Sequence, residues 1–511
     1  MSLSCSSEPT DLRALVPVET LVYLETNDLG AALQTVVESY AFERAAASKP
    51  DLSPLKGVQL AVAITGFESS EQVLTEEHSV GRIQPRFVAV VDTHLWSWQT
   101  SAFVENKLGS FVADSYGAKV TVERSDKHGG TYFVWSTVDG RNAFALVLGS
   151  LVLFGNDETL FEKCLAVKRG EAESIHTVGK VPSLNVDGLA VGYVSTDGVG
   201  QIASVIGLKM ASEAGDESEI QSAIAGILPM LIRNSITDIT WTAAKTDQGI
   251  EDKLKISTTT EVAPVLNETL TPDAAVDQSL FELVPPDAPS ITLYNLKTPH
   301  VAWRSVLLAA RTQTDPVAGQ IIAAFSGASF EPYGIGDGEL FLSGAGTNLV
   351  TANFDAEGEK PVVIASILVD TNVRKALLDD LKPHKPWTDE LGVEMLRSDE
   401  GDLAAAFIGT KIVVGNAEGV IGCVRARSSG KDIGRSPALV QKFTSNSSAT
   451  TLATDWSTPG SIARVLSEKR TDQTGAAYIT ETRFTRTAVE RRTVSELGLI
   501  GSIIAQLDAG E

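Results

Sequence analysis

The alternation of apolar and polar residues along the chain predicts short strands mixed with amphipathic helices. Apolar runs rich in Val, Tyr and Phe predict strands, and apolar positions at helical spacing predict helices. In the first half the predicted strands are residues 21–25, 58–65, 87–91, 119–124, 131–138, 143–148, 151–154, 189–195, 236–244 and 252–260. The predicted helices are residues 29–47, 96–113, a helix from Asn156 or Asp157 to about Arg169, and stretches within 199–234.

The second half of the chain shows the same order of predicted elements. Gly149-Ser150 and Gly409-Thr410 are both two-residue hairpin signals between apolar runs, and a helix follows each hairpin. The other predicted strands are residues 291–296, 362–369, 450–455 and a pair around 476–488. The other predicted helices are residues 300–312, 371–381 and the apolar segment Val494–Leu507.

The sequence itself also repeats, with an offset of 260 residues. Residues 143–156 (AFALVLGSLVLFGN) match residues 403–416 (LAAAFIGTKIVVGN), so that the Gly-Asn pair at the end of each segment coincides. Gly200-Gln201-Ile202-Ala203 matches Gly460-Ser461-Ile462-Ala463 at the same offset. Each copy is long enough to hold a core of its own, so we predict a tandem duplication and not a solenoid.

We therefore predict an α+β fold made of two homologous lobes, each a mainly antiparallel β-sheet covered by helices. Prolines gather with acidic and small residues in one stretch, which is typical of a linker, at Pro264, Pro272, Pro285 and Pro286. The expected parts are a flexible tether (1–12), a first repeat (13–262), a linker (263–288) and a second repeat (289–511).

The charge of the chain narrows the classes of partner. Among its 511 residues, 65 Asp and Glu stand against 42 Lys and Arg, for a net charge of −23. A surface this acidic repels phosphate backbones and anionic lipids, so nucleic acid is excluded as an expected partner. No apolar run approaches the roughly 18 residues that cross a bilayer. Contact with a membrane is expected only through a lipid anchor.

The amino terminus suggests such an anchor. Leu3-Ser4-Cys5 followed by small polar residues resembles the cleavage site of bacterial lipoproteins, in which the cysteine is lipidated and becomes the first residue. The resemblance implies lipid attachment at Cys5 and a location in the bacterial cell envelope, periplasmic or on the outer surface. The alternative is a cysteine that stands by chance in a polar cytosolic tail.

A second resemblance points to the same compartment. The segment Pro17–Glu25 reads P-x-E-T-x-x-Y-L-E, and this segment is similar to the opening of a bacterial protein family of unknown function. The hairpin followed by a helix, with Gly-Asn between them, is similar as well. Members of that family are secreted or lipid-anchored, so the resemblance implies an envelope location. It implies no catalytic residue.

The chain carries little of the usual chemistry of sites. The six histidines are dispersed, and neither His-x-x-x-His nor Cys-x-x-Cys occurs, so no metal and no cofactor is predicted. The glycine-rich stretch 334–339 is interpreted as a turn before a strand. No nucleophile elbow or phosphate-binding loop appears, so no catalytic residue is assigned. Cys164 and Cys423 fall at equivalent helix positions among apolar neighbours, and we expect both thiols to be buried and inert.

One local cluster, Asp92–Trp98, holds residues suited to binding or catalysis. It follows a predicted strand and enters a predicted helix. His94 beside Asp92 can act as a general base, and Trp96 and Trp98 can line a site for a sugar or another flat ligand. The second half has Asp370 in the equivalent place but no tryptophans, which favours a structural role for both aspartates at a helix N-terminus. Trp96 and Trp98 are the predicted ligand-binding residues.

Three functional hypotheses follow. The leading one is a non-enzymatic cell-envelope protein that is tethered through Cys5 and binds a small ligand or another envelope component. The second is a secreted hydrolase with its site near residues 92–98. The third is a structural interaction protein without a small ligand. The sequence leans away from an enzyme, and it does not identify the ligand, the partner or the oligomeric state.

Overall fold

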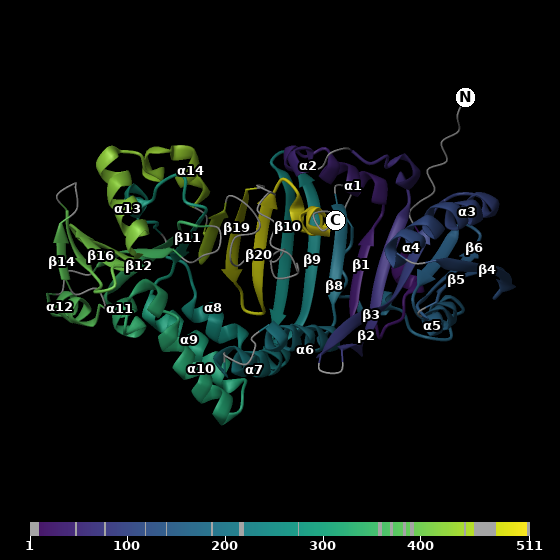
Figure 1. The fold of residues 1–511 in the computed structure, drawn as a ribbon, viewed down its shortest axis with the longest axis horizontal. Coiled ribbons are helices and arrows are strands. Elements are labelled where there is room, and N and C mark those ends of the chain that lie inside the picture. The colour runs from purple at the N-terminus through teal and green to yellow at the C-terminus, as the bar shows by residue number, and fades with distance from the viewer. Residues whose placement is uncertain are drawn as a thin grey trace. The chain divides into compact units, whose positions relative to one another are not determined.

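The structure is a computed structural model. It describes residues 10–45, 49–75, 78–117, 119–138, 140–184, 188–213, 219–273, 275–355, 360–367, 371–381, 385–388, 393–443, 446–453 and 477–507. These residues form two compact units (Figure 1). The first comprises Met1–Glu38 and Ser48–Lys245, and the second comprises Ser39–Ala47 and Thr246–Glu511.

The first unit is built on an antiparallel sheet. Its strands are β1 (Val22–Thr26), β2 (Gln59–Thr75), β3 (His78–Asp92), β4 (Val120–Lys127), β5 (Gly130–Thr137), β6 (Asn142–Leu148), β7 (Leu151–Gly155), β8 (Gly188–Val194) and β9 (Ile236–Thr246). Their order across the sheet is β9-β8-β1-β2-β3-β7-β6-β5-β4, and every neighbouring pair is antiparallel. The predicted hairpin at Gly149-Ser150 is present and joins β6 to β7.

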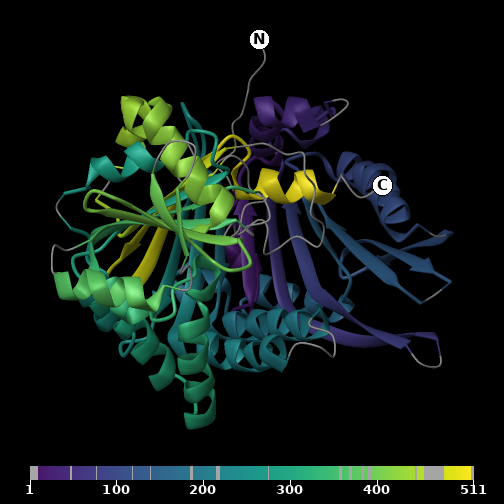
Figure 2. The same ribbon diagram turned by 60° about the vertical axis from the view of Figure 1, so that its left-hand side comes forward.

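Helices cover both faces of this sheet. They are η1 (Leu12–Leu15), α1 (Leu29–Val37), η2 (Ser53–Leu55), α3 (Ser97–Phe103), a π-helical turn η3 (Val104–Leu108), α4 (Gly109–Tyr116), α5 (Glu158–Lys168), η4 (Ile175–Val178), α6 (Thr196–Glu213) and α7 (Glu219–Ser235). One core packs η1, α5 and η4 on the sheet around Tyr23 and Phe161. The other packs η3 and α4 on the opposite face around Trp135 and Phe154. The helices α6 and α7 lie side by side (Figure 2).

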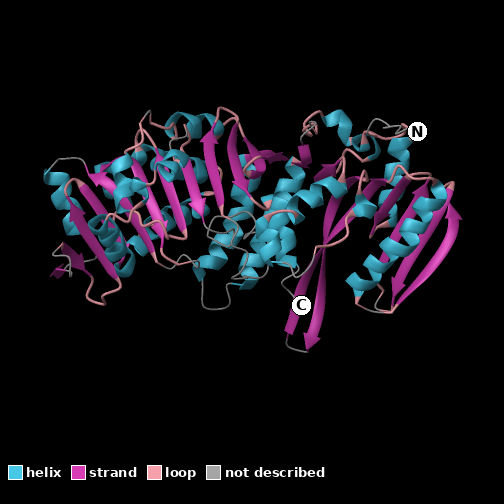
Figure 3. Ribbon diagram, turned by 90° about the horizontal axis from the view of Figure 1, so that it is seen from above, coloured by secondary structure: helices cyan, strands magenta, loops and turns pink. Residues whose placement is uncertain are grey.

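The second unit is built in the same manner. Its strands are β10 (Gly249–Thr258), β11 (Ser290–Asn295), β12 (Ala345–Asn353), β13 (Pro361–Ile367), β14 (Lys385–Thr388), β15 (Glu394–Arg397), β16 (Leu403–Ile408), β17 (Lys411–Asn416), β18 (Ala449–Ala453), β19 (Tyr478–Phe484) and β20 (Ala488–Ser495). The order is β10-β20-β19-β18-β11-β12-β13-β17-β16-β15-β14, again with antiparallel neighbours. In each unit the strands run side by side with helices packed over them (Figure 3).

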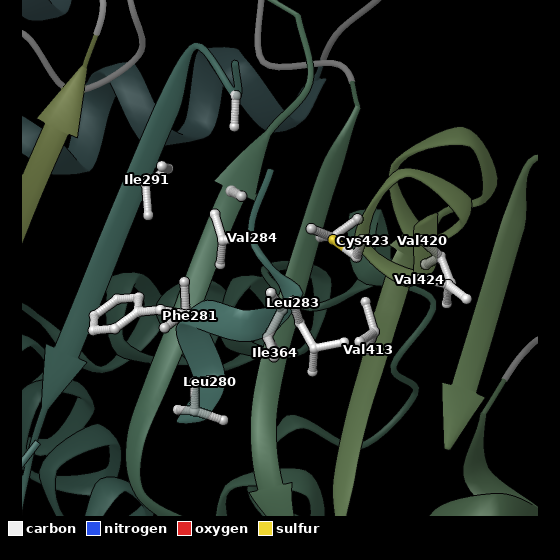
Figure 4. Packing of buried hydrophobic residues seen from close by; sticks show 14 of the residues in the cluster. Leu280, Phe281, Leu283, Val284, Ile291, Ile364, Val413, Val420, Cys423 and Val424 are labelled. Atoms are coloured by element: carbon white, nitrogen blue, oxygen red, sulfur yellow. The ribbon is translucent and has the colours of Figure 1, made fainter. Parts of the chain in front are cut away.

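The helices of the second unit also enclose two cores. They are α2 (Tyr40–Ala45), α8 (Ala263–Thr269), η5 (Gln278–Leu283), α9 (Pro299–Thr312), α10 (Pro316–Ala328), η6 (Glu331–Tyr333), α11 (Gly338–Gly344), α12 (Thr371–Asp380), α13 (Ala417–Ser429), η7 (Ile433–Arg435), α14 (Pro437–Lys442) and α16 (Gly498–Leu507). Figure 4 shows the first core, in which Cys423 of α13 lies with Ile364 and Val413 of the sheet and Phe281 of η5. The second core packs α11, α12 and η6 on the other face.

The structure confirms the α+β class and corrects several boundaries. The predicted helix 29–47 is interrupted, because α1 ends at Val37 and α2 begins at Tyr40. The predicted helix Val494–Leu507 begins only at Gly498, because residues up to Ser495 complete β20. The stretch 263–288, expected to link the repeats, contains α8 and η5. Apolar residues of this stretch are fully buried, at Leu280, Phe281, Leu283 and Val284.

Candidate functional site

An apolar cavity of about 300 Å³ lies in the second unit, between the sheet and its helices. This volume is at the lower end of the range for small-molecule sites. No charged side chain lines the described wall of the cavity. The wall is formed by Leu270, Tyr294, Leu296, Pro299, Ala302, Trp303, Val306, Ser329, Phe330, Tyr333, Phe341, Leu342, Leu349, Thr351 and Val363.

The floor of the cavity follows from strand alternation. Tyr294 of β11 is paired with Leu349 of β12, and Thr351 lies two residues further along β12. Residues two apart in a strand point to the same face of the sheet. The alternation in β11 and β12 therefore brings these side chains to the surface that the helices cover.

The opposite wall follows from helical spacing. Pro299, Ala302, Trp303 and Val306 of α9 line the cavity, and their spacing of three and four residues places them on one face of the helix. The next exposed apolar residue of the helix, Leu308, does not line the cavity. One face of α9 thus forms the wall, and Leu308 belongs to the outer surface.

Aromatic rings close one side of the cavity. The rings of Trp303 and Phe330 meet edge to face, with centroids 5.3 Å apart and an interplanar angle of 87°. A β-carbon at Gly338 would overlap the Phe330 ring, so the first residue of α11 must be a glycine for the ring to take this place. The geometry of this aromatic wall depends on a residue that does not itself line the cavity.

The polar groups of the wall are hydroxyls. Burial raises the pKa of Tyr333 to about 12, and the neighbouring Tyr294 contributes to the rise. Burial also raises the pKa of Tyr294, although an interaction with Thr351 opposes the effect. Both phenols therefore stay neutral at physiological pH. A site of this kind favours an apolar group and offers a few hydroxyls for orientation.

The predicted cluster Asp92–Trp98 lies in the first unit and has a different character. Trp96 is 76% exposed and Trp98 is 72% exposed, and Leu95 between β3 and α3 is 41% exposed. The structure thus places the two predicted ligand-binding residues at the surface, two residues apart in the chain. They are separate from the cavity wall of the second unit.

The polar residues of this cluster hold the chain in place. His94 Nε2 lies 2.9 Å from Gln59 Oε1, and His94 Nδ1 lies 3.5 Å from Asp92 Oδ1. Thr10 Oγ1 donates to Asp92 Oδ2 at 2.8 Å, and Thr10 N donates to Gln59 Oε1 at 2.8 Å. Both ring nitrogens of His94 therefore face protein groups. This arrangement suits a structural role for His94 better than the role of a general base.

The expected role of Asp92 at a helix N-terminus is wrong. The helix α3 begins at Ser97, and its N-cap is Trp96, whose backbone N donates to Gln99 Oε1 at 3.2 Å. Asp92 instead ends β3 and accepts a hydrogen bond from the backbone N of His94 at 3.0 Å. Burial alone would raise the pKa of Asp92, but hydrogen bonds from His94 and Thr10 hold this pKa below its usual range. Asp370, its expected counterpart, lies outside the described residues.

Cys164 and Cys423 are both buried, as predicted. Cys164 is 2% exposed and Cys423 is fully buried. Burial raises the pKa of Cys164 to about 12 and raises the pKa of Cys423 as well. Both thiols are therefore inert parts of the core. Cys5, the expected lipid attachment point, lies outside the described residues.

A second cavity, in the first unit, is larger and more polar. Its volume is about 850 Å³, and its wall includes Phe111 and Asn156. Arg86 and Asp157 also line this cavity, and Arg86 Nε donates to Asp157 Oδ2 at 2.6 Å. Because these polar groups already bond to each other, the cavity has fewer free groups to offer a ligand.

Sequence reasoning missed the apolar cavity altogether. Its residues come from several elements between Leu270 and Val363 and form no local motif. The one available signal is the density of aromatic residues from Tyr294 to Phe341. Within the described ranges, no group of three or more His, Cys, Asp or Glu side chains gathers as a metal site. None of the described helices has the length and apolar character needed to cross a membrane.

Comparison with known proteins leaves the chain without a family. No protein-family model matches it, and no curated protein matches it. Among solved structures it matches crystal form IV of TP0453, a Treponema protein, with 11% sequence identity and a TM-score of 0.25. The match covers 45% of this chain and 98% of TP0453. At this TM-score the match assigns neither a family nor a function.

Proposed function

We propose that the protein is a non-enzymatic, lipid-tethered component of the bacterial cell envelope that binds an apolar ligand, such as an acyl chain, in the cavity of the second unit. The observation that carries the proposal is the uncharged, aromatic-lined wall around Trp303 and Phe330. A methylene group moved from water into apolar surroundings contributes about 0.8 kcal/mol. Each further carbon of a bound chain therefore strengthens binding until the cavity is full.

The test fills the cavity and compares the result with a matched surface change. Val306 lies at the cavity wall on α9 and is 37% exposed, so Val306→Trp fills space without displacing the core. Leu308→Trp changes the same helix on its outer face, where the residue is 59% exposed. The probe is a fluorescent fatty acid whose emission rises in apolar surroundings.

We expect Val306→Trp to weaken binding of the probe at least about tenfold, and Leu308→Trp to leave it unchanged. Both variants should unfold with the cooperativity of the parent chain, as followed by circular dichroism. Equal binding by both variants, or no binding by the parent, would contradict the proposal. Saturable binding of a bulky polar ligand in place of the fatty acid would also contradict it.

We infer further that the two units derive from a tandem duplication. The strand order β9-β8-β1-β2-β3-β7-β6-β5-β4 parallels the order β19-β18-β11-β12-β13-β17-β16-β15-β14, strand for strand. The helices α5 and α13 follow equivalent hairpins, and each carries a buried cysteine. These correspondences support repeats at 13–262 and 289–511.

The envelope location and the lipid on Cys5 complete the proposal, and the partner would be another envelope component or the ligand itself. Support comes from the Leu3-Ser4-Cys5 pattern and from the polar residues that follow it. The mass of the protein isolated from its native cells tests the anchor. We expect an amino-terminal cysteine that carries acyl chains, and an unmodified chain in the cytosol would contradict the anchor.

A further inference from the structure

We propose that Leu95, Trp96 and Trp98 form a membrane-contact surface, seated in the headgroup region of the bilayer leaflet that holds the lipid on Cys5. This inference rests on the proposed tether, and it concerns a surface of the first unit that is separate from the apolar cavity. The occupant is a lipid bilayer with zwitterionic headgroups, because the net charge of −23 disfavours an anionic surface.

The exposure of these side chains is the first observation. Trp96 and Trp98 are 76% and 72% exposed, and Leu95 beside them is 41% exposed. Large apolar side chains that are exposed singly need no explanation, but here three lie within four residues of the chain. Tryptophan is the residue that favours the boundary between water and lipid, because its ring is apolar and its N–H is polar.

Hydrogen bonds fix the conformation of the turn at His94, which precedes the exposed residues. His94 takes a φ of 53°, which is uncommon for a residue other than glycine. Its backbone N donates to Asp92 Oδ1, and its ring contacts Gln59. The turn after β3 is thus fixed by buried polar partners, and the residues that follow are presented on a stable base.

The start of the described chain is tied to this same base. Thr10 donates from its backbone N to Gln59 Oε1 and from Oγ1 to Asp92 Oδ2, both at 2.8 Å. Its backbone O accepts from Gln59 Nε2 at 3.1 Å. Thr10 is therefore bound to Asp92, the strand end that leads into the segment with the exposed tryptophans.

Covalent geometry then limits how far the patch can lie from the lipid. Thr10 lies five residues after Cys5, and a chain spans at most about 18 Å over that length. Trp96 lies four residues after Asp92, which adds at most about 14 Å. A lipid on Cys5 therefore keeps the patch beside the membrane at a high effective concentration, where even a weak contact is populated.

The experiment supplies the tether chemically, so it does not depend on lipidation in the cell. Cys5 of the full chain is coupled to a maleimide lipid in phosphatidylcholine vesicles, while the buried Cys164 and Cys423 stay unreacted. Brominated phosphatidylcholine then quenches any tryptophan that enters the lipid. We expect quenching and a blue shift of the emission from the coupled protein.

Variants separate the patch from the rest of the surface. Trp96→Ser with Trp98→Ser should abolish the quenching, and Val122→Ser, an exposed residue of β4, should leave it unchanged. A flexible insert of roughly 30 Gly and Ser residues between Cys5 and Thr10 should weaken the quenching, because it lowers the effective concentration. Circular dichroism checks that each variant is folded.

Two results would overturn the inference. One is the wrong pattern of quenching: quenching that persists without the two tryptophans, or no quenching of the coupled parent chain. The other is an emission change of Trp96 and Trp98 on addition of an oligosaccharide with no response to vesicles, which would identify a site for a soluble flat ligand. Failure here leaves the Val306→Trp result and the mass of Cys5 as independent tests of the proposed function.

Discussion

At the scale of single residues, a Gly-Asn pair follows each of the two similar hairpins, as Gly155-Asn156 and Gly415-Asn416. The glycines have the same role in both units, and the asparagines have different roles. A β-carbon at Gly155 would overlap the carbonyl oxygen of Phe87, and one at Gly415 would overlap that of Pro361. The asparagines differ. Asn156 bonds to the backbone of Pro85 and Phe87, whereas Asn416 caps α13. The glycine is needed for strand packing in both units, and the asparagine has local uses.

Gly155→Ala tests this interpretation of the glycine. The new β-carbon meets backbone atoms of β3, which cannot rotate away, so β7 and β3 must separate. We expect a loss of about 3 kcal/mol in the free energy of unfolding, typical of overpacking in a core. Urea unfolding followed by circular dichroism measures it.

The hairpin glycine next to it provides the control. Gly149 has a φ of +71°, and open space surrounds the position of its missing β-carbon. Gly149→Ala should therefore cost only the backbone strain of the left-handed region, about 1 kcal/mol. If the Gly155→Ala variant is no less stable than the Gly149→Ala variant, β3 and β7 can separate at little cost in free energy, and the interpretation is wrong.

At the scale of elements, the glycine-rich stretch 334–339 shows how α11 is placed beside the cavity. Gly334 ends η6 with a φ of +73°. Asp337 caps α11 by accepting hydrogen bonds from Glu339 N at 3.0 Å and Leu340 N at 2.9 Å. Phe341 and Leu342 of this short helix line the cavity. The cap therefore positions part of the proposed binding wall.

Asp337→Ala removes both capping bonds. We expect a loss of about 1 kcal/mol in stability, which is the usual value of such a cap. Binding of the fluorescent fatty acid should weaken together with the melting temperature. Asp337→Asn keeps an acceptor at the same place and should restore most of both quantities. If Asp337→Ala leaves both unchanged, the cap does not hold α11.

The same stretch shows what the sequence can and cannot predict. The turn was predicted from its glycines, but a strand was expected after it, and α11 is a single short helix with little periodicity. Hairpins around Gly149 and Gly409 were predicted because turn chemistry is local. The burial of Phe281 in a proline-rich stretch was not, because it depends on contacts with α13 and η7 that are distant in sequence.

The same contrast between local and long-range features applies to the two candidate sites. Trp96 and Trp98 could be selected from the sequence because they lie only two residues apart in it. The cavity could not, because Leu270, Tyr294 and Phe341 meet only after the sheet and helices have assembled. Exposure, which decides what the two tryptophans can contact, also depends on the fold.

At the scale of the whole molecule, β10 connects the proposed repeats. By sequence it ends the first repeat, yet it belongs to the second compact unit and is paired with β20 from Ile250 to Ser257. Arg492 Nε bonds to Glu251 Oε2 at 2.5 Å, and the N–H of Leu499 donates to Asp252 Oδ2 at 2.9 Å. The second unit therefore includes a strand that lies before the predicted linker.

Two fragments test this assignment. Residues 246–511 retain β10, and we expect this fragment to be soluble and to unfold cooperatively. Residues 263–511 lack it, so β20 loses its partner strand and Arg492 loses Glu251, and we expect this fragment to be less stable. Sedimentation and circular dichroism compare the two. Equal behaviour would show that β10 is dispensable for the second unit.

The pairing of β10 with β20 also bears on whether one of the two proposed copies could be lost from the gene. On the proposed duplication, β10 and β20 are the last strands of the two copies, so deletion of either copy removes the strand that pairs with the last strand of the other. Such a dependence would favour keeping both copies even when only one carries a given activity. Each copy is free to specialise, which is consistent with an apolar cavity in one and an exposed pair of tryptophans in the other.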